Sequence, residues 1–405
     1  MKKFEIPTYY QSSIISKIKE IRYLQDPRKN DNSPTKLDFG PVIFYVARHF
    51  GFCYGVKNAI DIAYKTISEN PDKRIYLLSE MIHNPGVNSD LQSMNVKFIM
   101  DTSGNQIIPW EELTKEDIVI IPAFGTTLEI ENKLNELEID PYKYDTTCPF
   151  VEKVWNRSAQ LGDDNSTVII HGKNTHEETR ATFSHSVKNA PSLIVRNIKE
   201  TEYLASVILK EKSEEEFYKY FENKYSKNFD VSKDLQKIGV VNQTTMLASE
   251  TTAIAALLKE TMIKKYGEKE IENHFVDTRD TLCYATNDNQ DATYSLLKQK
   301  ADFAIVVGGY NSSNTGHIVE LCNEKIKTYF ISDYEKINDK KNISHFDLKN
   351  KKEILTENYL PQKEKTKILL TSGASCPDAE VDRVMLKLLS MFENTKPVDE
   401  VLGDL

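Results

Sequence analysis

The sequence predicts an α/β protein made of three similar α/β units with mainly parallel sheets, arranged as a pseudo-threefold ring around a central cavity. Two observations predict this fold class. Buried-strand patterns alternate with amphipathic-helix patterns along most of the chain. In addition, one strand–cysteine–helix arrangement occurs three times, around Cys53, Cys148 and Cys283.

Composition and charge narrow the class of protein. A chain of 405 residues with 40% hydrophobic residues is too long for one ordinary core and suits several compact units. The net charge is −9, and the sequence contains no cluster of basic residues that could form a positive stripe. These features exclude a typical nucleic-acid binder. No apolar run approaches the ~18 residues of a membrane span, and the first residues lack a secretory pattern. We therefore expect a cytoplasmic protein without membrane contact.

The first cysteine, Cys53, lies between a strand pattern at Val42–Val46 and a helix pattern at Val56–Asn70. Apolar residues of this helix recur at i, i+3, i+4 and i+7, and Pro71 ends it. Main-chain N–H groups at the start of a helix favour a thiolate. We therefore expect Cys53 to be available as a ligand.

The next two cysteines share the signature Asp-Thr-(Thr/Leu)-Cys, at 145–148 and 280–283. Pro149 suits the first position of a helix after Cys148. Cys283 follows a strand pattern at His274–Val276 and precedes a helix that reaches about Lys298. Five cysteines without a CxxC pair argue against a disulfide framework and against a zinc ribbon.

Two further strand patterns follow each cysteine helix, and each ends in a polar loop. Ligands bind at the carboxyl ends of parallel strands, so we expect these loops to converge on one cavity. The third unit has no downstream cysteine strand, and we expect Val42–Val46 to complete it and to close the ring. The strand patterns are Ile75–Leu78, Ile118–Ile121, Thr167–Ile170, Ile238–Val241, Phe303–Val307 and Ile368–Leu370.

These patterns divide the chain into units. Residues 1–40 form an N-terminal extension with a helix pattern at Ile14–Tyr23, and residues 394–405 form a C-terminal tail. We expect the charged segments at about 205–235 and 331–365 to be surface insertions. The first unit is 54–148, the second is 149–279, and the third is 280–393 completed by 41–53.

Three converging thiolates could hold zinc, with a His as fourth ligand, or a 4Fe–4S cluster with one iron free of protein ligands. The residues alone leave both open. Glu178 is a carboxylate within a polar loop, where burial would raise its pKa and suit it to proton delivery; a helix-capping carboxylate is the alternative. Compact hydrogen-bond donors that suit a phosphate or diphosphate occupy the loops: His83, His176, Ser312, Ser313, Asn314 and Ser375.

Eight motifs, in the same order, resemble the 4-hydroxy-3-methylbut-2-enyl diphosphate reductase (LytB) family over about Val42 to Phe392. They are Gly-Phe-Cys-Tyr-Gly-Val at 51–56, Ile-His-Asn at 82–84, Asp-Thr-Thr-Cys-Pro at 145–149, His-Glu-Glu at 176–178, Gln-Thr-Thr at 243–245, Cys-Tyr-Ala-Thr at 283–286, Asn-Ser-Ser-Asn at 311–314 and Gly-Ala-Ser-Cys-Pro-Asp at 373–378. The resemblance implies a trefoil-like fold. It also implies a two-electron reductive dehydroxylation that yields isopentenyl and dimethylallyl diphosphates, the last step of the methylerythritol phosphate pathway of isoprenoid biosynthesis.

The same resemblance implies roles for particular residues. Glu178 would be the catalytic proton donor, assisted by Thr244, which would also contact the substrate. Electrons would arrive singly from a ferredoxin or a flavodoxin. Cys53, Cys148 and Cys283 would ligate one 4Fe–4S cluster with one open iron, and the diphosphate would lie among His83, His176, Ser312, Ser313, Asn314 and Ser375.

One motif departs from the family pattern. Members generally carry a His in a Ser-Ala-His-Gly stretch that contacts the diphosphate, whereas this chain has Pro122-Ala123-Phe124-Gly125. Phe124 cannot donate a hydrogen bond, so that role is not carried over; Thr126 or Thr127 could compensate. Two other classes stay open on the residues alone, a zinc-dependent hydrolase of a phosphorylated metabolite and a non-enzymatic redox sensor.

Overall fold

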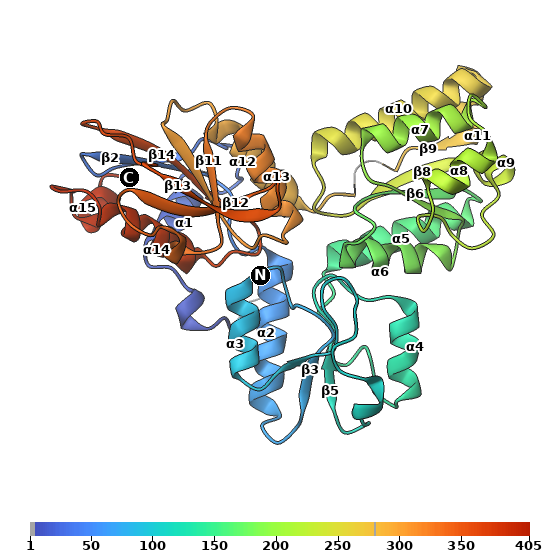
Figure 1. Ribbon diagram of the computed structural model, residues 1–405, viewed down its shortest axis with the longest axis horizontal. Coiled ribbons are helices and arrows are strands. Elements are labelled where there is room, and N and C mark those ends of the chain that lie inside the picture. Colours follow the sequence, from blue (N-terminus) through green and yellow to red (C-terminus); the bar gives the residue numbers. More distant parts are fainter. Residues whose placement is uncertain (1–4, 279–280) are drawn as a thin grey trace. The chain divides into compact units, whose positions relative to one another are not determined.

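The structure is a computed structural model that describes residues 5–278 and 281–405 (Figure 1). Asp280 of the second Asp-Thr-(Thr/Leu)-Cys signature therefore lies outside the described residues. The chain divides into two compact units. The terminal unit comprises Met1–Asp61, Ile82–Asp90 and Tyr284–Leu405, and the central unit comprises Ile62–Met81 and Leu91–Cys283.

The terminal unit is built on a sheet in the order β1-β2-β14-β10-β11. β2 pairs with β14, β14 with β10 and β10 with β11, all in parallel, and β1 is antiparallel to β2. The predicted pairing of Val42–Val46 with the C-terminal part of the chain is confirmed. The strands are β1 (Thr35–Asp38), β2 (Val42–Val46), β10 (Phe303–Val307), β11 (Thr328–Ile331) and β14 (Thr366–Ser372).

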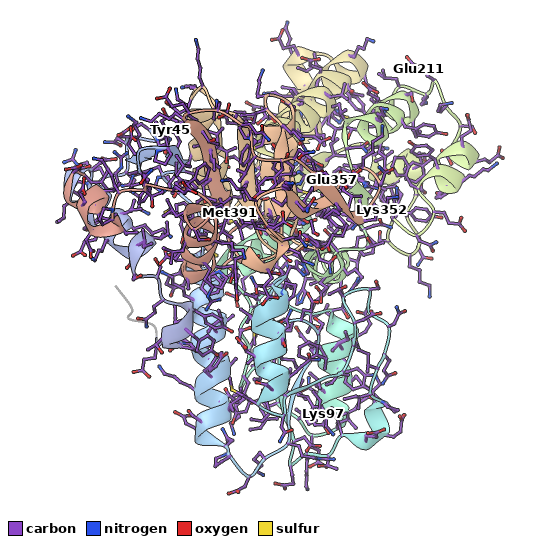
Figure 2. All side chains as sticks on the ribbon, turned by 60° about the vertical axis from the view of Figure 1, so that its left-hand side comes forward. Tyr45, Lys97, Glu211, Lys352, Glu357 and Met391 are labelled. Atoms are coloured by element: carbon purple, nitrogen blue, oxygen red, sulfur yellow. The ribbon has the colours of Figure 1, made fainter. Side chains whose placement is uncertain are left out.

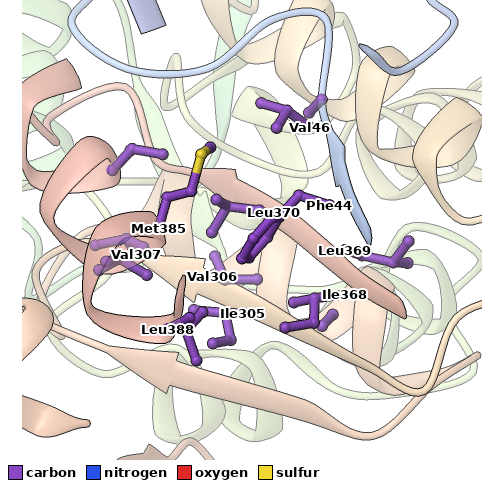
Figure 3. Packing of buried hydrophobic residues seen from close by; sticks show 14 of the residues in the cluster. Phe44, Val46, Ile305, Val306, Val307, Ile368, Leu369, Leu370, Met385 and Leu388 are labelled. Atoms are coloured by element: carbon purple, nitrogen blue, oxygen red, sulfur yellow. The ribbon is translucent and has the colours of Figure 1, made fainter. Parts of the chain in front are cut away.

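Helices bury the terminal sheet, so its inner strands are continuous apolar runs rather than alternating ones. Figure 3 shows Phe44, Ile305 and Leu370 of three neighbouring strands close to Met385 and Leu388 of α14. The helices of this unit are α1 (Ile14–Gln25), the first half of α2 (Tyr54–Glu69), most of α3 (Pro85–Ser93), α12 (Tyr284–Leu296), α13 (Ser313–Asn323), α14 (Asp378–Leu389) and α15 (Val398–Gly403).

The N-terminal extension is part of the terminal unit's core. It supplies the edge strand β1, and Ile14, Ile15 and Ile18 of α1 are buried. The carboxylate of Asp382 on α14 accepts from the main-chain N–H groups of Ser13, Ile14 and Ile15, at 2.9 to 3.0 Å. These groups have no partner within α1, so a carboxylate at this end stabilises the helix.

Residues 331–365 contain a hairpin of β12 (Asn342–Asp347) and β13 (Lys352–Glu357). Figure 2 labels the two ends of β13, Lys352 and Glu357. The hairpin is anchored by Ile343, which is buried, and by Phe346, whose ring stacks on Tyr310 at 4.5 Å between centroids. This segment is therefore an ordered β-hairpin that packs on the terminal unit, and its being an insertion stays a prediction.

The central unit contains a four-stranded parallel sheet in the order β7-β6-β8-β9. Helices α5 and α6 cover one face, and α7 and α10 cover the other (Figure 1). Val168 and Ile170 of β6 pack toward the first pair of helices, and Ile169 packs toward the second pair. The elements are α5 (Pro149–Asp163), β6 (Thr167–His171), α6 (Glu177–Val187), β7 (Ser192–Val195), α7 (Ile198–Ile208), β8 (Ile238–Asn242), α10 (Ala248–Tyr266), α11 (Ile271–His274) and β9 (Phe275–Val276).

Residues 205–235, predicted as a surface insertion, place three of their aromatic side chains in the core. The segment folds into α8 (Glu214–Tyr220) and α9 (Val231–Asp234). Phe217, Phe221 and Phe229 are buried in the core on the α7 side of the sheet. Phe217 and Phe221 are four residues apart and face the same side, while Lys219 between them stays in solvent.

The central unit also contains a three-stranded parallel sheet in the order β4-β3-β5. Mixed α/β units with mostly parallel sheets confirm the predicted fold class, and the ring of units stays a prediction. Within the described residues, no helix has the length and apolarity that crossing a bilayer requires. The remaining elements are β3 (Ile75–Leu77), β4 (Lys97–Phe98), β5 (Ile118–Ile120), α4 (Leu128–Glu136) and the 3-10 helices Thr8–Tyr10, Trp110–Glu112, Glu268–Glu270 and Tyr334–Lys336.

Candidate active site

The three predicted ligand cysteines occupy equivalent places. Each directly precedes a helix, α2, α5 or α12, and each is held from the other side by the loop that follows a parallel strand, β14, β5 or β8. In every case the cysteine N–H donates to a main-chain carbonyl of that loop. The pairs are Cys53 with Ala374 (3.2 Å), Cys148 with Ala123 (3.0 Å) and Cys283 with Thr244 (3.1 Å).

The shared Asp-Thr-(Thr/Leu)-Cys signature has a structural reason. Thr146, two residues before Cys148, donates its N–H and its hydroxyl to the carbonyl of Ile121 at the end of β5, at 3.1 and 2.6 Å. Thr281, two residues before Cys283, bonds through its N–H and hydroxyl to the Asn242 side chain at the end of β8, at 3.1 and 2.8 Å. In both loops a threonine fastens the cysteine segment to the neighbouring strand. The repeated signature is visible in the sequence, but the role of its first threonine depends on contacts with distant strands.

Burial separates these cysteines from the other two. Cys53, Cys148 and Cys283 are partly exposed, whereas Cys322 and Cys376 are fully buried in the terminal core. Burial also raises the pKa of Cys322 to about 12. For Cys53, burial raises the pKa above its ordinary value, and the N–H groups of Val56 and Gly55 lower it only in part. The expected effect of the helix start on Cys53 is thus present but smaller than the effect of burial.

Glu178 lies at the start of α6, is almost completely buried and is hydrogen-bonded to the main chain of Thr244. The main-chain N–H of Thr244 donates to Glu178 Oε1 at 2.5 Å, and the carbonyl of the same Thr244 accepts from Cys283. His176 is the N-cap of α6, and its Nδ1 accepts from the N–H of Glu178 at 3.2 Å. This bond places the ring proton of neutral His176 on Nε2, where it can be donated to an anion.

Phe124 lies directly after the carbonyl that holds Cys148, and its ring contacts His176 edge to face at 5.6 Å between centroids. Phe124 therefore fills space beside a predicted diphosphate ligand without offering a hydrogen bond. The suggested compensation receives no support from Thr127, whose hydroxyl hydrogen-bonds to Glu129. The main-chain carbonyl of Thr126 bonds to His185 at 3.1 Å.

In the terminal unit, predicted diphosphate ligands meet around the carbonyl of His83. Ser375 donates its hydroxyl to this carbonyl at 3.2 Å and lies 3.5 Å from the hydroxyl of Ser312. Ser312 is the N-cap of α13 and accepts from the N–H of Thr315 at 3.3 Å. Gly309 passes so close to His83 that a Cβ would lie 2.2 Å from its carbonyl oxygen. Only glycine allows this approach.

Asn314 connects the same loops to α12. Its Oδ1 accepts from the N–H of Ala374 at 2.9 Å and from the side chain of Asn289 at 3.3 Å. Ser313, between Ser312 and Asn314, is the first residue of α13. Because Ala374 also holds Cys53, the predicted cluster ligand and the predicted diphosphate loop share one main-chain segment.

Each unit thus brings part of the predicted site together. Among the residues that the structure describes, no three His, Cys, Asp or Glu side chains form a metal-binding group, so the meeting of the three thiols stays a prediction. The terminal unit holds Cys53, His83, Ser312, Ser313, Asn314 and Ser375, and the central unit holds Cys148, His176, Glu178, Thr244 and Cys283.

Comparison with known proteins agrees with the motifs. The model of the family described as LytB protein matches residues 44–389. Proteins named 4-hydroxy-3-methylbut-2-enyl diphosphate reductase are similar along nearly the whole chain. The one from Picosynechococcus sp. is 40% identical over 94% of this chain and 89% of its own length, and the one from Synechocystis sp. is 39% identical over 98% of this chain and 99% of its own.

A solved structure has the same fold. The E-1-hydroxy-2-methyl-but-2-enyl-4-diphosphate reductase of Plasmodium falciparum aligns with 88% of this chain and 89% of its own at a TM-score of 0.60 and 23% identity. With cysteines at three equivalent strand-to-helix junctions, a buried glutamate linked to one of them, and these matches, the chain belongs to the LytB family.

Proposed function

We propose that this protein is an iron–sulfur reductase that converts (E)-4-hydroxy-3-methylbut-2-enyl diphosphate to isopentenyl diphosphate and dimethylallyl diphosphate. The observation that carries the proposal is the continuous main-chain link between Cys283, Thr244 and Glu178. It connects a thiol suited to a metal with a buried carboxyl group suited to proton delivery. Packing alone would not require a buried carboxyl group to be hydrogen-bonded to the segment that holds Cys283.

The residues fit a 4Fe–4S cluster held by three cysteines. Their donor atoms are thiols, the ligands that iron–sulfur clusters prefer, and each thiol lies at a partly exposed loop-to-helix junction. When bound, a cluster with one iron lacking a protein ligand supplies electrons one at a time and a Lewis-acidic site for an oxygen atom. Cys53, Cys148 and Cys283 would hold it, while Cys322 and Cys376 are enclosed in the hydrophobic core.

The diphosphate would bind through neutral donors at two helix starts. His176 at α6 can donate from Nε2, and Ser312 at α13 offers a hydroxyl beside that of Ser375. Helix N-termini add the partial positive charge of the macrodipole, which favours an anion. Holding the charged end of the substrate in this way would position its hydroxyl end for reaction.

Glu178 would supply a proton to the departing oxygen. Its Oε1 accepts from the Thr244 N–H, so the carboxyl group is held in one orientation and would carry the acid proton on Oε2. The overall reaction consumes two electrons and two protons. The C–O bond breaks, one proton leaves with the hydroxyl group as water, and the other is added to the allylic carbon skeleton.

We further propose that a one-electron carrier protein, ferredoxin or flavodoxin, supplies the electrons, and that the reaction takes place in the cytoplasm. A cluster that accepts electrons singly matches such carriers. The Thr244 hydroxyl would contact the substrate beside Glu178, since the two residues are in direct hydrogen-bond contact.

The test is anaerobic purification with iron and sulfide quantification, followed by an assay with a reduced one-electron dye. Replacing Cys53, Cys148 or Cys283 singly with Ser should remove the absorbance near ~400 nm and the activity. Cys322→Ala is the matched control, because this buried cysteine lies in the core and its loss should leave the absorbance intact. Zinc in place of iron and sulfide would instead favour a hydrolase.

A further inference from the structure

A pocket of about 210 Å³ in the terminal unit opens beside Cys53. Its walls come from the N-terminal extension, from the loop before Cys53 and from the first turns of α12. The extension supplies Lys19, Tyr23 and Lys29, the loop supplies Arg48 and His49, and α12 supplies Tyr284 and Asp288. The structure thus gives the extension, which the reaction does not use, a place next to a proposed cluster ligand.

Arg48 is an unusual buried cation. It is only 7% exposed, and its guanidinium donates to the main-chain carbonyls of Arg22 and Asp26 at 3.3 and 3.4 Å. Its Nε has no hydrogen-bond partner, and within the described part of the chain no carboxylate forms an ion pair with it. Asp26 and Asp31 act on Arg48 only from beyond ion-pair distance, so a carboxylate that enters the pocket would be the first to pair with it directly.

Three basic residues line the pocket, Lys19, Lys29 and Arg48, against the single acidic residue Asp288. Lys19 is paired with Asp378 at 2.7 Å, and Asp288 is the acidic group on the wall. Lys29 is exposed and forms no ion pair with any described residue. Burial, together with the positive charges of Arg48, Lys29 and Lys19, lowers the pKa of His49 to about 4.

We infer that this pocket and its rim are the docking surface for an acidic one-electron carrier protein, which inserts a carboxylate side chain toward Arg48. The inference rests on the proposed function, because it takes Cys53 as a cluster ligand. Electron transfer weakens steeply with distance, so a carrier must dock beside a ligand of the cluster. Cys53 lines the pocket and meets that requirement.

Two features favour a protein over a small metabolite. The pocket is smaller than the ~300–1,000 Å³ of ordinary small-molecule sites and is open, which suits one inserted side chain. Its rim carries two exposed aromatic rings, Tyr23 at 56% and Tyr284 at 40% exposure, and tyrosine with arginine is enriched in protein interfaces. On a chain of net charge −9, a local positive patch is also what would orient an acidic partner.

The test uses the anaerobic holoenzyme and an acidic plant-type ferredoxin as the probe. The dissociation constant of the two oxidised proteins is measured at low and at high salt, and turnover is measured with reduced ferredoxin and with reduced methyl viologen. Lys29→Glu is the test variant. Lys352→Glu is the matched control, an identical charge reversal at an exposed lysine on β13, which contributes nothing to the pocket (Figure 2).

We expect Lys29→Glu to weaken ferredoxin binding about 5- to 20-fold at low salt, with most of the difference lost near ~0.5 M salt. Turnover with methyl viologen should stay within about twofold of wild type, because a small dye needs no docking surface. Tyr23→Ala should weaken binding at both salt concentrations, since an apolar contact is not screened. Lys352→Glu should leave ferredoxin binding unchanged.

Equal dissociation constants for Lys29→Glu and Lys352→Glu would overturn the docking surface. Tight binding of inorganic phosphate that is lost in Arg48→Met, with ferredoxin binding unaffected by Lys29→Glu, would also overturn it and assign the pocket to a small anion. Failure of the proposed function is a separate result, namely no turnover of the wild-type protein with methyl viologen. The binding measurement does not depend on turnover and so decides the docking surface on its own.

Discussion

Replacing Gly309 by alanine should disturb the proposed diphosphate site through the main chain of His83. A Cβ at position 309 would lie 2.2 Å from the His83 carbonyl oxygen and 2.9 Å from its carbonyl carbon. These are main-chain atoms, so no side chain can rotate away. The same oxygen accepts the hydroxyl of Ser375 at 3.2 Å, which means that the substitution presses on a hydrogen-bonded contact.

The size of the effect follows from these distances. A Cβ···O contact needs roughly 3.2 Å, so the two segments must separate by about 1 Å, and overpacking of this kind costs about 1–3 kcal/mol. Weakening the Ser375 hydrogen bond adds about 1 kcal/mol. We expect Gly309→Ala to lower the free energy of unfolding by about 2–4 kcal/mol and to raise KM for the substrate several-fold or more, since a displacement of ~1 Å in a positioning group can cost up to ~10²-fold.

The assay is anaerobic thermal unfolding of the holoenzyme together with KM for the diphosphate substrate. Gly316→Ala is the matched control, because it lies within α13, only seven residues further on, and a Cβ there meets no atom within 4 Å. Alanine at an open helical position should stabilise the protein by about 0.5–1 kcal/mol. If Gly309→Ala proves as stable as Gly316→Ala and binds substrate equally well, the close approach of these loops has no energetic role and the reasoning is refuted.

Three further predictions concern chemistry and pH. Glu178→Gln keeps an acceptor for the Thr244 N–H but has no acid proton, so turnover should fall about 10²- to 10⁴-fold while substrate affinity, measured by calorimetry, stays within about threefold; wild-type turnover would remove Glu178 from the mechanism. His49 has a pKa of about 4 in the folded protein and an ordinary value near 6.5 when unfolded, so the unfolded chain binds more protons between these values. Stability should therefore fall as pH drops from 6.5 to 4, by about 1–2 kcal/mol after allowance for solvent screening of a half-buried group, and urea unfolding of His49→Gln should lack this slope. Phe124→His places a donor beside His176 and should lower KM about fivefold, the equivalent of one hydrogen bond; an unchanged KM would show that the diphosphate does not reach residue 124.

The strands were predictable because buried parallel strands are short, continuous apolar runs. Val42–Val46 and Phe303–Val307 have the bounds that the pattern indicated. That Val42–Val46 completes the third unit followed from the lack of a cysteine strand downstream of that unit, and the structure shows that its partner is β14. β1 was not predicted, since its edge position buries only every other residue of a four-residue strand. The aromatic core of α8 was also missed, because charged neighbours of Phe217 and Phe221 dominate the local composition.

The sequence by itself determined the alternation of strands and helices, the placement of three cysteines at helix starts and, through its motifs, the family. Local order encodes all three, because they depend on residues within a few positions of each other. Only the tertiary structure decided which atoms hold the site: the amide of Thr244 orients Glu178 across 66 residues, and Gly309 makes room for His83. It also decided that the N-terminal extension joins the pocket beside Cys53. Contacts of this kind depend on how distant segments pack, and no periodicity along the chain records them.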